Sequence, residues 1–166
     1  MKRLDGTGPA SDVEEAAMIS NGERKGLLLT QHRHLRPLLI ALDKEASEVL
    51  SSASETEGHE VQILRERIES LHRELLDHFE AEEALFEREL CETDEWGPFR
   101  LARLRNAHSR HRALLAALRA EPPLLPPHSL AHVASALTSE VLGQMVEEEC
   151  ELAAGGTVQE DSALAI

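Results

Sequence analysis

The feature that most constrains the fold of this chain is a histidine-bearing segment that occurs twice. Residues 32–42 read HRHLRPLLIAL, and residues 108–118 read HSRHRALLAAL. A second matching pair lies downstream of these copies, because residues 78–83 read HFEAEE and residues 144–149 read QMVEEE. The spacing predicts two related helical hairpins that carry histidine and carboxylate side chains on inward-facing turns, as metal sites in four-helix bundles require.

Composition favours an all-α fold built from these hairpins. Apolar residues make up 42% of the 166 residues, and most of them are Leu and Ala, which are strong helix formers. Tyr is absent, Trp occurs once and Phe three times, whereas β-sandwiches and barrels draw on aromatic and β-branched residues. A chain of this length is enough for one domain with a buried core. We therefore predict an antiparallel up-down four-helix bundle.

Charge and hydropathy argue against two classes of partner. A formal net charge of −14 disfavours nucleic acid, which needs a basic patch, and also disfavours anionic membrane surfaces. No apolar run approaches the roughly 20 residues that span a bilayer. The basic N-terminus is followed by no hydrophobic stretch, so the sequence predicts a cytoplasmic protein.

Hydrophobic periodicity predicts four helices. Their expected ranges are 23–52, 59–90, 99–119 and 129–153. Pro37 lies inside the first helix and predicts a kink or an irregular turn just after His32. Ser129 is the expected N-cap of the fourth helix. Residues 1–22 and 154–166 are expected to be tails on either side of a bundle that spans residues 23–153.

The ligand-type side chains are expected to meet in the core of this bundle. Residues four apart lie on one helix face, so His78 and Glu82 can reach the same point, and Glu148 takes the matching place in the second hairpin. His32 and His108 occupy matching turns of the first and third helices. Imidazole with carboxylate suits iron, zinc, copper or manganese. These five residues are therefore candidate ligands of a buried metal centre.

Gln144 breaks the repeat, because it stands where a histidine is expected. His111 is the nearest substitute, since it lies one turn beyond His108 on nearly the same face. It either supplies a second imidazole from the third helix or fills the packing position that Leu35 occupies in the first copy.

The remaining acids and histidines near the site receive lesser roles. Glu83 and Glu149 lie one residue off the converging face, where they either support the ligands or face solvent. His34 is two residues from His32 and points elsewhere. Only His72 lies in a Glu-x-x-His spacing, whereas a ferritin-like di-iron site needs two such motifs.

These residues resemble the hemerythrin-like family of HHE cation-binding domains. In that family the first helix contributes a His, the second a His-x-x-x-Glu pair, the third one or two His, and the fourth a His followed by a carboxylate. The matching residues are His32, His78, Glu82, His108 and Glu148. Gln144 departs from the pattern, and the similarity covers roughly residues 24–153.

The resemblance implies a non-haem centre that holds two iron ions, bridged by oxo or hydroxo and by the carboxylates of Glu82 and Glu148. It implies that the centre binds or senses O2 or a related small molecule such as NO or peroxide. A di-iron peroxidase or catalase-like enzyme is one alternative. A metal-free interaction bundle that has lost a ligand at Gln144 is another.

Gln144 leaves three outcomes open for the centre. Gln144 itself coordinates weakly and leaves one iron reactive, His111 substitutes for the missing imidazole, or the site holds one metal ion or none. An open coordination position favours reactivity over purely structural binding.

Overall fold

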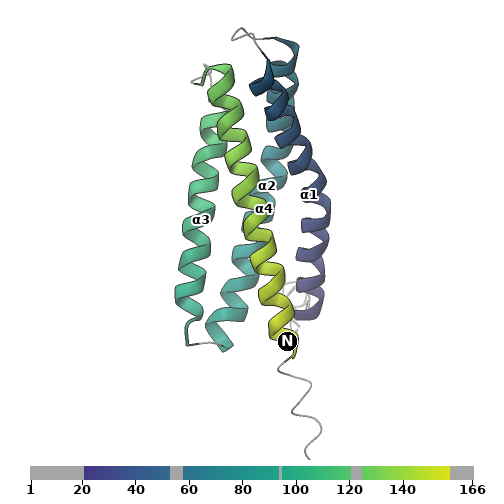
Figure 1. Cartoon of the computed structure of the whole chain (residues 1–166). Helices are drawn as coiled ribbons and strands as arrows, with labels where there is room; N and C mark the ends of the chain where they lie inside the picture. The colour runs from purple at the N-terminus through teal and green to yellow at the C-terminus, as the bar shows by residue number, and fades with distance from the viewer. Residues whose placement is uncertain (1–20, 53–57, 94, 121–124, 158–166) are drawn as a thin grey trace, which may run out of the picture.

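All four expected helices form, and they build a four-helix bundle with neighbours running in opposite directions (Figure 1). The computed structural model describes residues 21–52, 58–93, 95–120 and 125–157. The helices are α1 (Asn21–Ser51), α2 (His59–Thr93), α3 (Gly97–Leu118) and α4 (Pro127–Thr157). No strand occurs in the described part of the chain, so the predicted all-α class is confirmed.

Three helices, α1, α3 and α4, begin two residues earlier than predicted, and in α3 and α4 the first turn contains a proline. α4 starts at Pro127, and the amide of Leu130 donates to the carbonyl oxygen of Pro126 at 2.9 Å. Ser129 therefore lies inside the first turn, and its prediction as the N-cap is wrong. α3 likewise starts at Gly97, with Pro98 in its first turn. A proline fits there because the first amides of a helix have no intrahelical partner.

The first helix runs through its internal proline. α1 is helical from Asn21 to Ser51 without a break, so the irregular turn that we considered just after His32 does not form. Pro37 lies on the exposed side of α1. A carbonyl that loses its helical partner on that side can bond to water instead.

The predicted tails fall largely outside the described residues. α4 continues to Thr157, four residues beyond the predicted end of the bundle, while residues 1–20 and 158–166 are not among those described. None of the four helices, over their described residues, is long and apolar enough to cross a bilayer.

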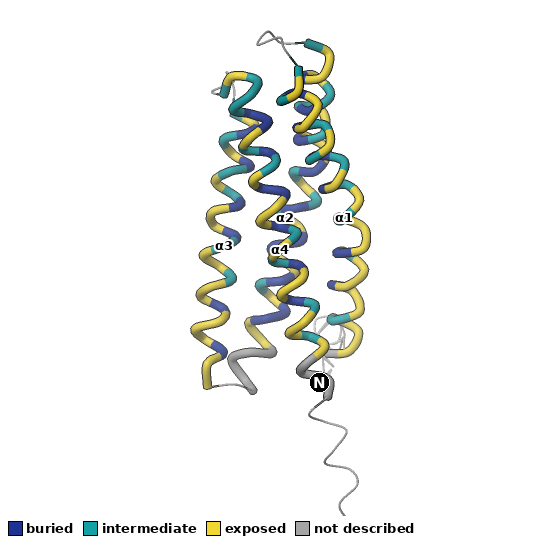
Figure 2. The backbone as a smooth tube through the Cα atoms, viewed as in Figure 1, coloured by how far each residue is buried: buried dark blue, intermediate teal, exposed yellow. Residues whose placement is uncertain are grey.

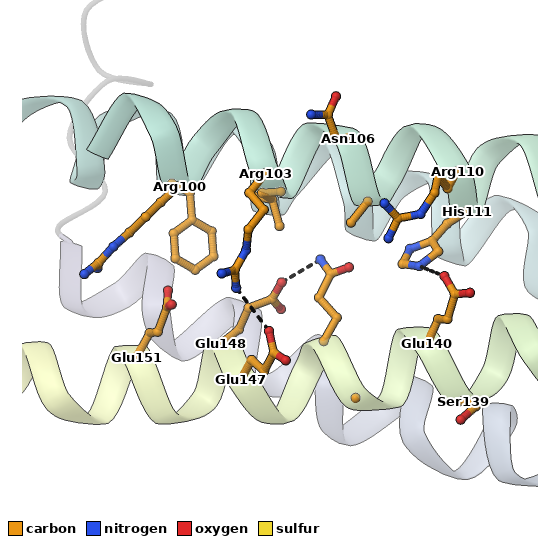
Figure 3. A pocket seen from close by; sticks show the side chains of 15 residues that line it. Arg100, Arg103, Asn106, Arg110, His111, Ser139, Glu140, Glu147, Glu148 and Glu151 are labelled. Atoms are coloured by element: carbon orange, nitrogen blue, oxygen red, sulfur yellow. Dashed lines mark hydrogen bonds and ion pairs between the residues drawn. The ribbon is translucent and has the colours of Figure 1, made fainter. Parts of the chain in front are cut away.

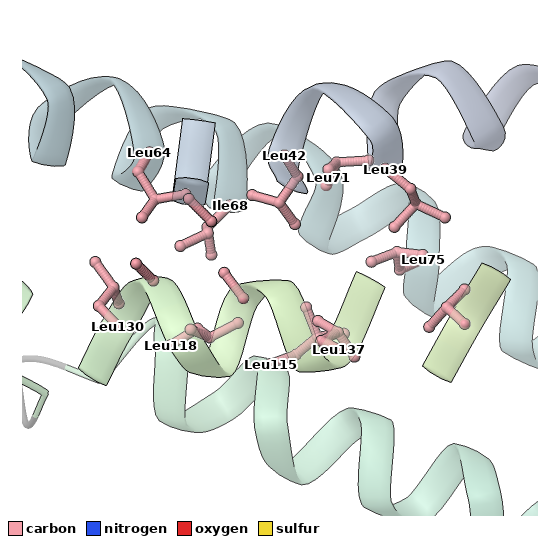
Figure 4. Packing of buried hydrophobic residues seen from close by; sticks show 14 of the residues in the cluster. Leu39, Leu42, Leu64, Ile68, Leu71, Leu75, Leu115, Leu118, Leu130 and Leu137 are labelled. Carbon is pink, nitrogen blue, oxygen red and sulfur yellow. The ribbon is translucent and has the colours of Figure 1, made fainter. Parts of the chain in front are cut away.

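Each helix turns its buried residues toward the bundle axis (Figure 2), and the apolar ones form two separate clusters. The larger cluster fills one end and most of the middle, where leucines from all four helices interdigitate (Figure 4). The smaller one lies toward the other end and contains Leu28, Leu85, Phe86 and Leu101. Between the two clusters the helices bury polar side chains instead, and this layer contains the candidate site.

Candidate metal centre

Five ligand-type side chains from all four helices meet in the polar layer. Four of them are at most 2% exposed, and Glu148 is 5% exposed. They are His32 from α1, His78 and Glu82 from α2, His108 from α3 and Glu148 from α4. They form two groups in which one ligand atom of each residue lies within 4.8 Å of the others. The sequence-based expectation that these five residues converge is therefore met.

The first half-site consists of His32, His78 and Glu82. Oε1 of Glu82 lies 3.1 Å from Nε2 of His32 and 3.4 Å from Nε2 of His78. The two imidazole rings stand nearly perpendicular, with their centroids 5.1 Å apart. Both Nε2 atoms therefore point at the same carboxylate oxygen.

The second half-site consists of Glu82, His108 and Glu148. The other oxygen of Glu82, Oε2, lies 3.0 Å from Nε2 of His108. Oε2 of Glu148 lies 3.6 Å from Nε2 of His32, so Glu148 also faces the first half-site. Glu82 belongs to both groups, with one oxygen turned toward each.

Gln144 lies next to the second half-site, at the position that corresponds to His78 in the repeat. Its Nε2 lies 2.8 Å from Nε2 of His108 and donates to Oε1 of Glu148 at 2.6 Å. Its own carbonyl oxygen, Oε1, is buried and has no hydrogen-bond partner. The second half-site thus has one imidazole where the first has two.

The outward nitrogen of two of these histidines faces a supporting glutamate, which in turn accepts a hydrogen bond from an arginine. Nδ1 of His32 lies 3.1 Å from Glu149, and Arg36 donates to the same glutamate at 2.8 Å. We call this chain the first support. Carboxylates in this position fix the ring orientation of a ligating histidine and raise its basicity.

The second support repeats this arrangement on the other hairpin. Nδ1 of His108 lies 2.9 Å from Glu83, and Arg112 donates to that glutamate at 2.8 Å. Glu83 and Glu149 therefore have the supporting role that we considered for them. The role of the two arginines was not predicted from the sequence, although each arginine follows its histidine by four residues in its copy of the repeat.

The supports leave buried acceptors facing one another at the centre. A neutral imidazole has one N–H, yet both nitrogens of His108 face carboxylates, and Oε2 of Glu82 makes no hydrogen bond. When Nδ1 of His108 donates to Glu83, the Nε2 lone pair points toward the centre, where Oε2 of Glu148 is also buried and unpartnered. Converging lone pairs and carboxylates of this kind fit a cation, so the residues present match a metal site.

Burial and contacts with neighbouring side chains together separate the pKa values of the two central glutamates. Burial and contact with Glu82 raise the pKa of Glu148 well above its usual range. Burial acts on Glu82 in the same sense, but contacts with the imidazoles of His108 and His32 outweigh it and hold the pKa of Glu82 far below that range. Burial also lowers the pKa of His78 to about 4. Without metal, the pair therefore keeps one proton between two carboxylates.

His111 is buried but lies outside both ligand groups. Its Nε2 lies 3.2 Å from Glu140, as the dashed contact in Figure 3 shows, and its Nδ1 has no hydrogen-bond partner. Its ring centroid lies 5.6 Å from that of Phe79, which also stacks on His108 at 4.6 Å. His111 thus fills the packing position that corresponds to Leu35, and Phe79 is a neighbour of the site that the sequence analysis did not single out.

Two further histidines, His34 and His72, lie away from both ligand groups. His34 is exposed and pairs with Glu74 at 2.6 Å on the outside of the bundle. His72 is half-buried and contacts Arg119 rather than either ligand group.

A pocket of about 740 Å³ opens between α3 and α4 and reaches the second half-site. Figure 3 shows arginines of α3, among them Arg103 and Arg110, opposite glutamates of α4. Gln144 and Glu148 form part of its wall. We call it the α3–α4 pocket. The first half-site contributes no residue to its lining, so the two half-sites differ in access as well as in composition.

Comparison with known proteins points to a cation-binding domain. A family model described as "Hemerythrin HHE cation binding domain" matches residues 26–154. No curated protein and no solved structure matches the chain. The matched range contains every residue of both half-sites and both supports.

Proposed function

The chain belongs to the hemerythrin HHE cation-binding domain family, and on that premise we propose that its buried cluster is a non-haem centre for two iron ions that binds or senses O2 or a related small molecule such as NO or peroxide. The ligands are His32, His78, Glu82, His108 and Glu148. Iron held there supplies reversible redox chemistry and a Lewis-acidic position for a small ligand.

The position of Glu82 is the observation that carries this proposal. A carboxylate that is fully buried must be paired or must coordinate a metal. Its two oxygens face different imidazoles, at 3.1 Å and 3.4 Å on one side and at 3.0 Å on the other. A carboxylate set between two imidazole groups in this way is suited to bridge two ions.

The chain's own side chains prepare the site for this role. The first and second supports orient His32 and His108 so that each Nε2 faces the centre, which is the orientation that a ligand needs. Phe79 stacks on His108, and the two apolar clusters close the layer from both ends. The core side of the site therefore excludes bulk water, while the α3–α4 pocket supplies a way in.

The α3–α4 pocket also favours a second candidate function, a peroxide-consuming enzyme. A pocket of about 740 Å³ that reaches Gln144 and Glu148 is larger than a diatomic gas needs. Such a pocket suits turnover of a substrate that enters and leaves repeatedly. The absence of Tyr rules out a tyrosyl radical in any such chemistry.

Iron content and absorbance test the proposal together. Protein from iron-replete expression should contain about two iron ions per chain and show near-ultraviolet charge-transfer bands that shift with O2 or azide. His78→Ala should lose iron and these bands while it keeps its helicity, and His34→Ala, a change at an exposed histidine, should lose neither. Rapid oxygen evolution from added peroxide would favour the enzyme. A colourless, iron-free and stable protein would refute both functions and leave the metal-free bundle.

A further inference from the structure

We propose that the two half-sites fill in a fixed order, and that the second half-site is an exchangeable cation site which the side-chain amide of Gln144 guards. The ion of the second half-site enters and leaves through the α3–α4 pocket. The expected occupant is a divalent transition cation such as Fe²⁺. This inference rests on the proposed function, because it requires that the cluster binds metal.

The first step concerns the lone pair of His108. Nδ1 of His108 lies 2.9 Å from the carboxylate of Glu83. An ionised carboxylate accepts hydrogen bonds and donates none. Arg112 donates to the same carboxylate at 2.8 Å, so Glu83 acts as an acceptor toward both side chains. The proton of His108 therefore resides on Nδ1, and Nε2 presents its lone pair.

The second step concerns what that lone pair meets. Nε2 of Gln144 lies 2.8 Å from Nε2 of His108, so one amide hydrogen points at the atom that must bind the ion. The other amide hydrogen is donated to Glu148 at 2.6 Å. Both neighbours are acceptors, so the nitrogen rather than the oxygen of the amide belongs on this side. A lone pair serves one partner at a time, and Gln144 therefore competes with an ion for two of the three ligands.

The first half-site has no such competitor. The Nε2 atoms of His32 and His78 both face Glu82, and no side-chain amide nitrogen among the described residues makes a hydrogen bond to either of them. The amide of Gln31 approaches His78 only at Nδ1, on the outward side, at 3.4 Å through its oxygen. An ion can therefore enter the first half-site without displacing a side-chain amide.

The third step concerns how the amide of Gln144 can move away from His108 and Glu148. Its Oε1 is buried without a hydrogen-bond partner, and so is Oε2 of Glu148 beside it. Only the two donated hydrogen bonds hold the amide in place. Both residues line the α3–α4 pocket, where Glu147 is paired with Arg103 at 3.3 Å. The pocket thus gives the amide room to move and gives a cation a route to the second half-site along the glutamates of α4.

Calorimetric titration of the metal-free, full-length chain with Fe²⁺ under anaerobic conditions tests this order. We expect two phases of one ion each, the second roughly 10- to 100-fold weaker, which is the ratio that two hydrogen bonds of modest net strength supply. A single phase in which two ions bind with equal affinity would overturn the inference and leave the proposed function standing. No binding at all would refute the proposed function itself.

Two variants separate a guarding amide from a weak ligand. Gln144→Leu keeps a bulky side chain at this position and removes both hydrogen bonds, so a guard predicts that the second phase becomes tighter. A weaker second phase would show that Gln144 binds the ion, and it would overturn the inference. Gln144→His supplies the imidazole that the repeat lacks and should bring the two phases together. Unchanged separation in that variant would also count against the inference.

Two controls accompany these titrations: a variant elsewhere in the α3–α4 pocket, and the stoichiometry of the first phase. Ser139→Ala alters the pocket lining away from the ligands and should leave both phases unchanged. The first phase should keep its stoichiometry of one ion in both Gln144 variants, which shows that the bundle is folded.

Discussion

The two hairpins support their histidines in the same way but differ at the position nearest the central carboxylates. In each support a histidine, a glutamate from the opposite hairpin and an arginine one turn after the histidine form a chain. The chains are His32–Glu149–Arg36 and His108–Glu83–Arg112. The inner position is an imidazole in the first half-site and an amide in the second. The asymmetry of the centre is therefore chemical, and the architecture around it is close to symmetric.

This comparison teaches that one substitution can change a site without disturbing its framework. An imidazole offers a lone pair to an ion, whereas the amide nitrogen of Gln144 offers a hydrogen to the ligands that the ion needs. Gln144 also forms part of the wall of the α3–α4 pocket. We therefore expect the second half-site to determine how small molecules reach the centre, how many ions it holds and how reactive it is.

The largest expected effect comes from the residue that the two half-sites share. Glu82→Gln removes the carboxylate that faces both imidazole groups, so iron should fall from about two ions per chain to none. Metal analysis of the purified variant measures this. Glu80→Gln changes an exposed acid on the same helix and should keep full iron. One ion retained in Glu82→Gln would show that the half-sites are independent, against this account.

A matched pair of substitutions in the supports should produce the next largest effect. Glu149→Gln and Glu83→Gln each weaken the support of one histidine, and each should reduce metal affinity about 10- to 100-fold. Glu149→Gln should weaken the tighter phase of the titration, and Glu83→Gln the weaker one. Equal effects of both changes on both phases would mean that the supports do not act on separate half-sites.

Acidification should destabilise the metal-free protein through His78. Burial lowers its pKa from 6.5 to about 4, so the folded state resists the proton that the unfolded chain accepts. Above pH 6.5 this histidine is neutral in both states and does not reduce the free energy of unfolding. As pH falls from 6.5 toward 4, the free energy of unfolding decreases by up to about 3 kcal/mol. Urea unfolding from pH 7 to 4 measures it as the difference between the wild type and His78→Gln. Parallel pH curves for the two proteins would contradict the assignment.

The smallest expected effect is at His111. His111→Leu places at this position the residue that the first copy of the repeat carries, Leu35. Because His111 lies outside both ligand groups, the variant should keep its iron and its absorbance, and it should be at least as stable in thermal unfolding. Loss of one iron would show instead that His111 supplies the imidazole that Gln144 lacks.

The repeated spacing was sufficient to predict the bundle and the convergence of its ligands. Helical period alone places His78 and Glu82 on one face, and the second copy of the pattern brings His108 and Glu148 to the same layer. These expectations depend on local geometry and on a duplicated order of elements. Both are properties that a sequence displays directly.

The remaining features depend on distances between helices, which spacing does not contain. The contact between Glu149 and His32 joins α4 to α1. Arg36 can donate to Glu149 only because those two helices are in contact. The α3–α4 pocket and the amide contact of Gln144 with His108 likewise depend on how closely two helices approach. The proline-containing helix starts were missed for a different reason, because a proline that ends a helix can also begin one.

Anomalous diffraction from crystals of the iron-loaded protein tests the central claim most directly. The account predicts two anomalous peaks at the iron edge on either side of the Glu82 carboxylate, one beside His32 and His78 and a weaker one beside His108 and Glu148. An empty polar layer, or iron bound only at surface carboxylates, would contradict it.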